Sequence, residues 1–377
     1  MATKNRAGRA CAPAVLRCAV LAAAMLPLGV CVSAVRAQEA ASAGDAPFFQ
    51  SLGRIEGLAA RAAKKIPRGA AAWDAPAAPG HIIVIPMRLK TAWDGSGDIH
   101  VDCVFDGKPY SCLLDTGGGD RIIVPDDSFF RRYPVVGQGS FGSASGTQTP
   151  ADIIRVLNLS VGGNSLGAAD LTRQGARSCR TMSSPIFAGQ SVRYQNADYY
   201  FGQAGAALIL NGPAPGGPFF PLSMRDAHRH MVISVAIGSD ASYALFDTGA
   251  GMTIIDKDYV AAHPGNFSYA DKTWAMDTSC RKLPARFYVA HNISIGGLVF
   301  HNFGVLALDL SATRAIADDG RVEMIVGYNI ISRANWYFDL AHQRWTVRQI
   351  APLTAPLVWT GAAAAGPVAL GSLPFGS

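Results

Sequence analysis

Residues 113–120 read LLDTGGGD, and residues 245–252 read LFDTGAGM. In both stretches an apolar pair leads into Asp-Thr-Gly, and small residues follow. Glycine at such a place lets the backbone approach a neighbouring group that any side chain would keep away. The two stretches therefore predict two equivalent positions in the fold, each of which presents one aspartate, Asp115 or Asp247, at the end of an apolar strand.

The sequence around the two stretches repeats as well. Residues 99–124 and 231–256 both show an alternating apolar strand, a glycine turn, a second apolar strand, Asp-Thr-Gly and a further apolar strand. Farther on, NLSVGG begins 43 residues after Asp115 and NISIGG begins 45 residues after Asp247. Two landmarks at nearly constant spacing predict the duplication of one β-rich unit.

Composition and punctuation suggest how the 377 residues are divided. With 40 Gly, 22 Pro and only 16% charged residues, the chain is typical of a turn-rich, mostly β protein. The stretch NGPAPGGPFFP at 211–221 indicates a linker, placed at 213–221, between a first lobe at 81–212 and a second lobe at 222–350. Residues 38–80 predict a basic helix at 49–65 and an Ala/Pro linker, and residues 351–377 form a low-complexity tail.

The first 37 residues resemble a secretory signal peptide, because basic residues precede an apolar run at 18–32. The sequence therefore predicts export to the periplasm, the cell surface or the medium. A membrane anchor is the alternative, and LGVC at 28–31 approaches the motif for a lipid anchor on Cys31. Of the 33 Lys and Arg residues, five lie in this segment, which leaves 28 against 27 acidic residues, a net charge of +1. Basicity therefore gives no reason to expect nucleic acid as a partner.

Four cysteines remain after the signal segment, and an even number in an exported protein predicts two disulfides. Cys103 and Cys112 flank the turn FDGKPY and are expected to pair across a hairpin. Cys179 and Cys280 would then join the two halves. Four free buried thiols are the alternative, and the absence of a Cys-x-x-Cys motif disfavours a zinc ribbon.

Two lobes folded about a pseudo-twofold axis would bring Asp115 and Asp247 together. Two adjacent carboxylates cannot both ionise cheaply, so they would share a proton. One can then take a proton from a water while the other donates one to a carbonyl oxygen. Around this pair, Gly117 and Gly249 leave room for backbone N–H groups, and the hydroxyls of the two adjacent threonines can bond across the lobe interface; these threonines are Thr116 and Thr248.

These motifs resemble the active-site loops of the aspartic peptidases, both pepsin-like and retropepsin-like. The run MIVGYNIISRANWYFDL at 324–340 resembles the family's apolar-apolar-Gly element, whose first-half counterpart is expected near residue 200, with Tyr200, Phe201 and Gly202 as the candidate. By the same resemblance, SFGSASG at 140–146 would be a flap hairpin over the substrate, carrying Phe141 and Gly142. The resemblance implies an all-β, two-lobed fold with pseudo-twofold symmetry, and an extended polypeptide as substrate.

The sequence thus predicts an exported aspartic endopeptidase that needs no metal or other cofactor and acts as a monomer, since one chain supplies both aspartates. A catalytically silent peptide- or ligand-binding protein on the same fold is the alternative. The basic helix at 49–65 also suggests a prosegment that covers the acidic pair.

Weaker motifs point elsewhere. GQGSFG at 137–142 matches a dinucleotide-binding pattern but is followed by no helix signal. GNSLG at 163–167 would present Ser165 in a serine hydrolase, although a hairpin turn explains it as well. His228 and His230 have no third ligand that the sequence could place, and are interpreted as surface histidines.

Overall fold

The computed structural model describes residues 81–92, 94–118, 121–143, 146–175, 184–188, 194–202, 205–223, 230–279, 281–314, 322–350 and 368–369. The signal segment, the helix expected at 49–65, Cys179, Cys280 and His228 lie outside these residues. Within the described ranges, no helix has both the length and the apolar character needed to cross a membrane.

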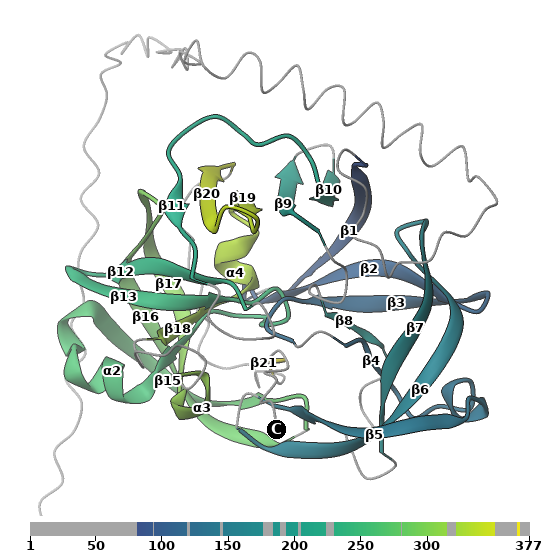
Figure 1. Ribbon diagram of the computed structural model, residues 1–377. Helices are drawn as coiled ribbons and strands as arrows, with labels where there is room; N and C mark the ends of the chain where they lie inside the picture. Colours follow the sequence, from purple (N-terminus) through teal and green to yellow (C-terminus); the bar gives the residue numbers. More distant parts are fainter. Residues whose placement is uncertain are drawn as a thin grey trace, which may run out of the picture. The chain divides into compact units, whose positions relative to one another are not determined.

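The first half of the chain forms a strongly bent sheet from short antiparallel and parallel pairings (Figure 1). Its strands in spatial order are β2 (Gly97–Phe105), β3 (Lys108–Asp115), β8 (Ile186–Ala188), β4 (Ile123–Val124), β7 (Asn164–Gln174), β6 (Gln148–Val161) and β5 (Val135–Gly142). Strand β2 also pairs with the far end of β6, which folds the sheet back on itself. A short 3-10 helix, Phe130–Arg132, separates β4 from β5.

The second half repeats this arrangement strand for strand. The spatial order is β12 (Val232–Ile237), β13 (Asp240–Phe246), β18 (Val322–Val326), β14 (Ile254–Asp256), β17 (Leu298–Leu308), β16 (Lys282–Ile295) and β15 (Phe267–Met276). Here β12 pairs with β16 as β2 pairs with β6. The helices of this half are α2 (Lys257–Ala262), η3 (Pro264–Asn266), α3 (Ser311–Arg314) and α4 (Tyr328–Ile331). The identical strand order confirms the predicted duplication of a β-rich unit.

The first sheet continues beyond β2 into a group of strands, called here the interlobe sheet, that joins the two halves. The strands β11 (Phe220–Pro221), β20 (Arg344–Gln349), β19 (Ala334–Asp339), β9 (Asn196–Gly202), β10 (Gly205–Leu210) and β1 (Ile83–Thr91) form it in this order. Strand β9 from the first half pairs with β19 from the second, and β1 pairs antiparallel with β2 of the first half. The Pro/Gly-rich linker arches over this interlobe sheet (Figure 1). The Arg348 guanidinium of β20 donates a hydrogen bond to the Gly216 carbonyl of the linker.

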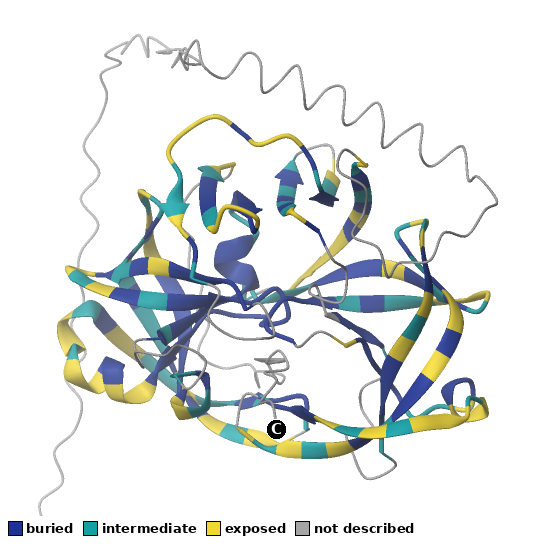
Figure 2. Ribbon diagram, viewed as in Figure 1, coloured by how far each residue is buried: buried dark blue, intermediate teal, exposed yellow. Residues whose placement is uncertain are grey.

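An aromatic core lies under the interlobe sheet. Phe246, the residue before Asp247, is fully buried, and its ring centroid lies 5.3 Å from that of Trp336 and 4.8 Å from that of Phe338. Tyr199 of β9 packs on the same ring at 5.3 Å. Aromatic pairs at these separations contribute about 0.5–1.5 kcal/mol each beyond the area they bury. Residues from both halves therefore hold in place the strand that leads to Asp247. Helix α4, whose four residues are all buried, lies next to this core (Figure 2).

The hairpin of β2 and β3 carries the disulfide Cys103–Cys112, as the sequence predicted. Cys103 lies opposite Tyr110, and Cys112 lies opposite Val101. The two cysteines are therefore diagonal neighbours on one face of the hairpin, and both are fully buried. The bridge closes a loop that ends three residues before Asp115, so it braces the strand that presents this aspartate.

The expected first-half counterpart of the apolar-apolar-Gly element is wrong. In the second half, β18 runs parallel to β13, with Leu245 opposite Ile325. In the first half, β8 runs parallel to β3 in the same manner, with Leu113 opposite Ile186. The true counterpart is therefore Ile186–Ala188, whereas residues 200–202 belong to β9 of the interlobe sheet. Ile186, the first residue of β8, follows Asp115 by 71 residues, whereas its counterpart Ile325 follows Asp247 by 78. The spacing in the second half therefore does not locate β8 in the first half.

Candidate active site

Asp115 and Asp247 occupy equivalent places in the two halves. Asp115 is the last residue of β3, where it lies opposite Ala188 of β8. Asp247 follows β13 directly, and its backbone N–H donates to the Val326 carbonyl of β18 over 3.1 Å. Asp115 is 0% exposed and Asp247 is 1% exposed. Each aspartate thus stands at the end of an apolar strand, as the sequence predicted, and the structure adds that each of these strands lies between two neighbours.

The two Asp-Thr-Gly loops bind each other through their threonines. The Thr248 hydroxyl donates to the Leu114 carbonyl over 2.9 Å and accepts from the Thr116 N–H over 3.1 Å. In the opposite direction, the Thr116 hydroxyl donates to the Phe246 carbonyl over 2.8 Å and accepts from the Thr248 N–H over 3.0 Å. Four buried hydrogen bonds, related by the pseudo-twofold axis, therefore lock the loops together.

The two glycines bring backbone against the carboxyl groups. A Cβ at Gly117 would collide with the Asp247 carboxyl, and a Cβ at Gly249 would lie 2.6 Å from Cγ of Asp115. Each glycine thus faces the aspartate of the other lobe. The N–H groups of Gly249 and Gly117 both donate to Asp247 Oδ1, over 2.8 Å and 3.2 Å. Only glycine leaves room for this approach, which explains its place in both motifs.

Burial raises the pKa of Asp247 well above its ordinary value, and the Asp115 carboxyl, which is hydrogen-bonded to it, raises this pKa further. The N–H groups of Gly249 and Gly117 act in the opposite direction, because they favour the charged form. The balance favours a pair that keeps one proton over a wide pH range. A pair in this state can accept one proton and donate another, which is the requirement for general acid–base chemistry.

In the second half, a further polar network supports the loop. The Thr253 hydroxyl and N–H both donate to Asn329 Oδ1 over 2.8 Å, and the Thr253 hydroxyl accepts from the Gly327 N–H over 3.2 Å. Asn329 in turn donates to the Gly304 carbonyl over 2.8 Å. The sequence analysis did not single out these residues. Their signal is a threonine six residues after Asp247 and an asparagine two residues after the glycine of the apolar-apolar-Gly element.

The proposed flap is a hairpin. Strands β5 and β6 pair up to Gly142 and Gln148, and the turn between them is closed by the Ser143 N–H, which donates to the Thr147 carbonyl over 3.1 Å. Phe141 is only 6% exposed, and it packs with Ile123, Ala151 and Ile186 beneath the hairpin. Its ring thus anchors the base of the turn.

The second half carries an equivalent flap that the sequence analysis missed. Strands β15 and β16 pair up to Met276 and Lys282, and the Asp277 N–H donates to the Arg281 carbonyl over 3.2 Å. The two turns meet, because the Arg281 guanidinium donates to the Thr147 hydroxyl over 2.8 Å. Thr147 and Arg281 are equivalent positions under the duplication, so the flaps touch at the pseudo-twofold axis. Pro150 and Pro284, each three residues after its turn, were the available signal.

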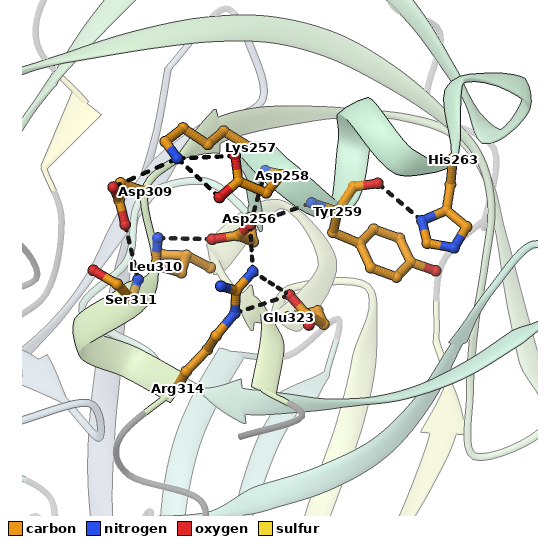
Figure 3. A network of polar contacts seen from close by, with 10 residues as sticks. All are labelled: Asp256, Lys257, Asp258, Tyr259, His263, Asp309, Leu310, Ser311, Arg314 and Glu323. Carbon is orange, nitrogen blue, oxygen red and sulfur yellow. Dashed lines mark hydrogen bonds and ion pairs between the residues drawn. The ribbon is translucent and has the colours of Figure 1, made fainter. Parts of the chain in front are cut away.

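A polar network joins helix α3 to the start of α2 and to strand β18 (Figure 3). Asp256 caps α2 by accepting from the N–H groups of Asp258 and Tyr259, over 2.8 Å and 3.2 Å. Arg314 of α3 reaches the same carboxylate at 2.5 Å and Glu323 at 3.0 Å. At the other side of α3, a side chain at Gly146 of the first flap would lie 3.3 Å from Ala312. The network therefore fixes a wall of the second lobe against which the first flap rests.

The weaker sequence motifs lie in regular structure. Residues 137–142 belong to strand β5, without a helix behind them. Ser165 lies on β7 opposite Ser160, just after the hairpin turn of Gly162 and Gly163. His230 is fully buried, so the surface interpretation is wrong for this residue. In the described part of the chain, no cluster of three or more His, Cys, Asp or Glu side chains is placed to hold a metal ion.

The fold and site define a mostly β, two-lobed molecule whose duplicated loops bring two buried carboxyl groups together. Residues 233–330 match the family described as aspartyl protease. The matched region runs from β12 to α4 and contains Asp247, the second flap and Gly327. This match supports the assignment of the chain to the aspartic peptidases, and the two sheets are consistent with the two-lobed fold of that family. A comparison with curated proteins found no match.

Proposed function

We propose that the chain is an exported aspartic endopeptidase in which Asp115 and Asp247 activate a water for attack on a peptide bond. The observation that carries the proposal is the pair itself: two buried carboxyl groups, hydrogen-bonded to each other, with the pKa of Asp247 raised. Within such a pair, the ionised carboxylate takes a proton from the water as it attacks the carbonyl carbon. The protonated carboxyl donates to the carbonyl oxygen, so charge never accumulates on the substrate.

The surroundings suit a polypeptide substrate. Two flap hairpins meet over the axis that relates the aspartates, and the first of them presents β5 as the last strand of its sheet. An extended peptide can add to such an edge through main-chain hydrogen bonds. Because a single chain supplies both lobes, we propose a monomer as the active form. The apolar run at 18–32 supports export, with a lipid anchor on Cys31 as the one membrane attachment that we propose.

The alternative of a silent binding protein loses its original basis. It depended on a poor first-half counterpart of the apolar-apolar-Gly element and on an uncertain flap. Strand β8 now fills the first role, and the β5–β6 hairpin fills the second. We therefore put forward the peptidase alone.

The test is cleavage of an unfolded protein substrate between pH 3 and pH 7. We expect acid-optimal cleavage by the wild type and its loss in Asp115→Asn and in Asp247→Asn. Asp258→Asn is the matched control, because it removes an exposed carboxyl of the same lobe and should leave the profile unchanged. Equal cleavage by the wild type and both pair variants would exclude the mechanism. A folded wild type that cleaves at no pH, with residues 1–80 removed, would favour the binding protein instead.

A further inference from the structure

The Asp-Thr-Gly loop of the first half is one residue longer than that of the second half, and it ends in an exposed cation. In the second half, the carbonyl of Thr253, six residues after its aspartate, accepts from β17. In the first half, the carbonyl of Ile122, seven residues after its aspartate, accepts from the equivalent strand β7. Ile122 and Thr253 are both buried. The residues before them differ, because Met252 is 2% exposed whereas Arg121 is exposed to solvent.

Arg121 lies at the same end of the sheet as Asp115. In the first half, β8 runs between β3 and β4 (Figure 1). Asp115 of β3 lies opposite Ala188, and Ile123 of β4 lies opposite Ile186. Because β4 runs antiparallel to β8, the chain from Ile123 back to Arg121 runs toward the end of β8 at which Asp115 stands. Neighbouring strands are about 4.8 Å apart, so two strand spacings place the backbone of Arg121 about 10 Å from that of Asp115.

The Arg121 guanidinium faces the flap strand β5. A Cβ at Gly139 would lie 3.5 Å from Arg121 Nη1. Phe141, two residues farther along β5, points to the same side of the strand, because side chains alternate. Its ring packs with Ile123 and Ile186, so this is the side of β5 that is turned toward β4 and β8. Because Gly139 has no side chain, β5 does not cover the guanidinium.

The charge of Arg121 is not taken up by an acidic partner. Among the residues that the structure describes, Arg121 makes no hydrogen bond or ion pair. The carboxylates on the adjacent strands already have arginine partners. Arg155 donates to Asp170 over 2.6 Å and 2.9 Å, and Arg173 donates to Asp152 over 2.6 Å. Arg155 lowers the pKa of Asp170, and Arg121 adds a smaller effect from farther away. A carboxylate that enters beside β5 therefore meets a cation that is available for pairing.

We infer that Arg121 is a specificity-determining residue that binds an acidic side chain, Glu or Asp, of the polypeptide substrate. This inference rests on the proposed function and adds the class of substrate to it. A peptide that pairs with the edge of β5 turns alternate side chains to the face on which Arg121 lies. An extended chain rises about 3.3 Å per residue, so a separation of about 10 Å from Asp115 places the acidic residue about three positions from the scissile bond. A guanidinium binds a carboxylate through two parallel N–H···O bonds, whereas an amide of the same shape offers one acceptor and no charge.

The experiment uses a library of synthetic decapeptides that are uncharged except for one Glu, placed at each position in turn, and the matching Gln forms. At about pH 5, where Glu is ionised, we expect the wild type to cleave the Glu form with a kcat/KM about tenfold higher at one position, mainly through KM. In Arg121→Gln this ratio should fall to about one, and Arg121→Glu should prefer Lys to Gln at the same position. Arg131→Gln is the matched control, because Arg131 is exposed and pairs with Asp126 outside this face, so its ratio should equal that of the wild type.

The pH dependence separates charge from shape. A free Glu side chain has a pKa of about 4.3, so the preference for Glu over Gln should disappear between about pH 5 and pH 3. A preference that persists at pH 3, a wild-type ratio of one at every position, or an unchanged ratio in Arg121→Gln would overturn the inference.

A second measurement does not depend on catalysis. The dissociation constants of the same peptides, labelled with a fluorophore, are measured for Asp247→Asn by fluorescence anisotropy at about pH 5. Binding of one Glu form about tenfold more tightly than its Gln form, lost in the double variant Arg121→Gln/Asp247→Asn, supports the inference even if no variant cleaves any peptide. Equal dissociation constants for all pairs, or no binding of any peptide at millimolar concentration, overturn it even if the peptidase proposal holds.

Discussion

The threonine lock between the lobes allows a quantitative test by Thr248→Val, which removes one hydroxyl and keeps the shape of the side chain. The Leu114 carbonyl and the Thr116 N–H both lose their partner in a buried site. A buried polar group left without a partner costs about 1–3 kcal/mol. Two such groups predict that the free energy of unfolding falls by about 2–6 kcal/mol. The second loop should also shift, so kcat/KM should fall with stability.

The duplication supplies the control for this prediction. Thr116→Val orphans the Phe246 carbonyl and the Thr248 N–H, the equivalent pair of groups. Its cost should match that of Thr248→Val within about 1 kcal/mol. Thr273→Val, on the partly exposed outer strand of the second flap, should change stability by less than about 0.5 kcal/mol. Urea unfolding at fixed pH gives all three values. A loss below 0.5 kcal/mol for Thr248→Val, or a large asymmetry between the two lock variants, would refute the reasoning.

Three further predictions concern pH, the flaps and the glycines. Burial raises the pKa of Asp198 to about 7, against an ordinary value of 3.8 and with Arg348 acting the other way. The contribution of Asp198 to stability is therefore complete below about pH 4 and is lost as the pH rises through about 7. Asp198→Asn should then raise the thermal midpoint more at pH 8 than at pH 4. Equal shifts at the two pH values would contradict this. Arg281→Met breaks the contact between the flaps and should raise KM about threefold with little change in kcat. Thr147→Val removes the other partner of this contact and should have the same effect. If the effects on KM were additive in the double variant, the two residues would not share a contact. Gly249→Ala places a Cβ 2.6 Å from Cγ of Asp115 and should lower kcat/KM at least about 100-fold, whereas Gly265→Ala, which meets open space, should be neutral in the same assay.

Local patterns in the sequence were sufficient for several features. The hairpin that places Cys103 near Cys112 is set by a short turn, so the disulfide could be predicted from spacing alone. The repeat of Asp-Thr-Gly and of the later Val-Gly-Gly or Ile-Gly-Gly landmark predicted two equivalent lobes, because residues that form strands and turns act over a few positions. The match of residues 233–330 to the aspartyl protease family agrees with that interpretation.

Features that join distant segments were missed or misplaced. Ile186–Ala188 is a three-residue strand in a parallel pairing, and so short a pattern cannot be told from a loop before its partner is known. The sequence of the second flap resembles that of the first only at Pro284, which matches Pro150. Its turn is therefore recognised from the tertiary contact between Arg281 and Thr147. The placement of β21 (Val368–Ala369) on β15 has no local signal at all.

The sequence by itself determined that the chain contains two similar β-rich units, each ending a strand in an aspartate with glycine beside it. Only the tertiary structure decided which groups surround those aspartates, namely the reciprocal threonines and the glycine N–H groups, and that the two flaps meet. The reason is physical. Strand periodicity, turns and hairpins are properties of neighbouring residues, whereas the burial that raises the pKa of Asp247 depends on contacts between residues more than a hundred positions apart.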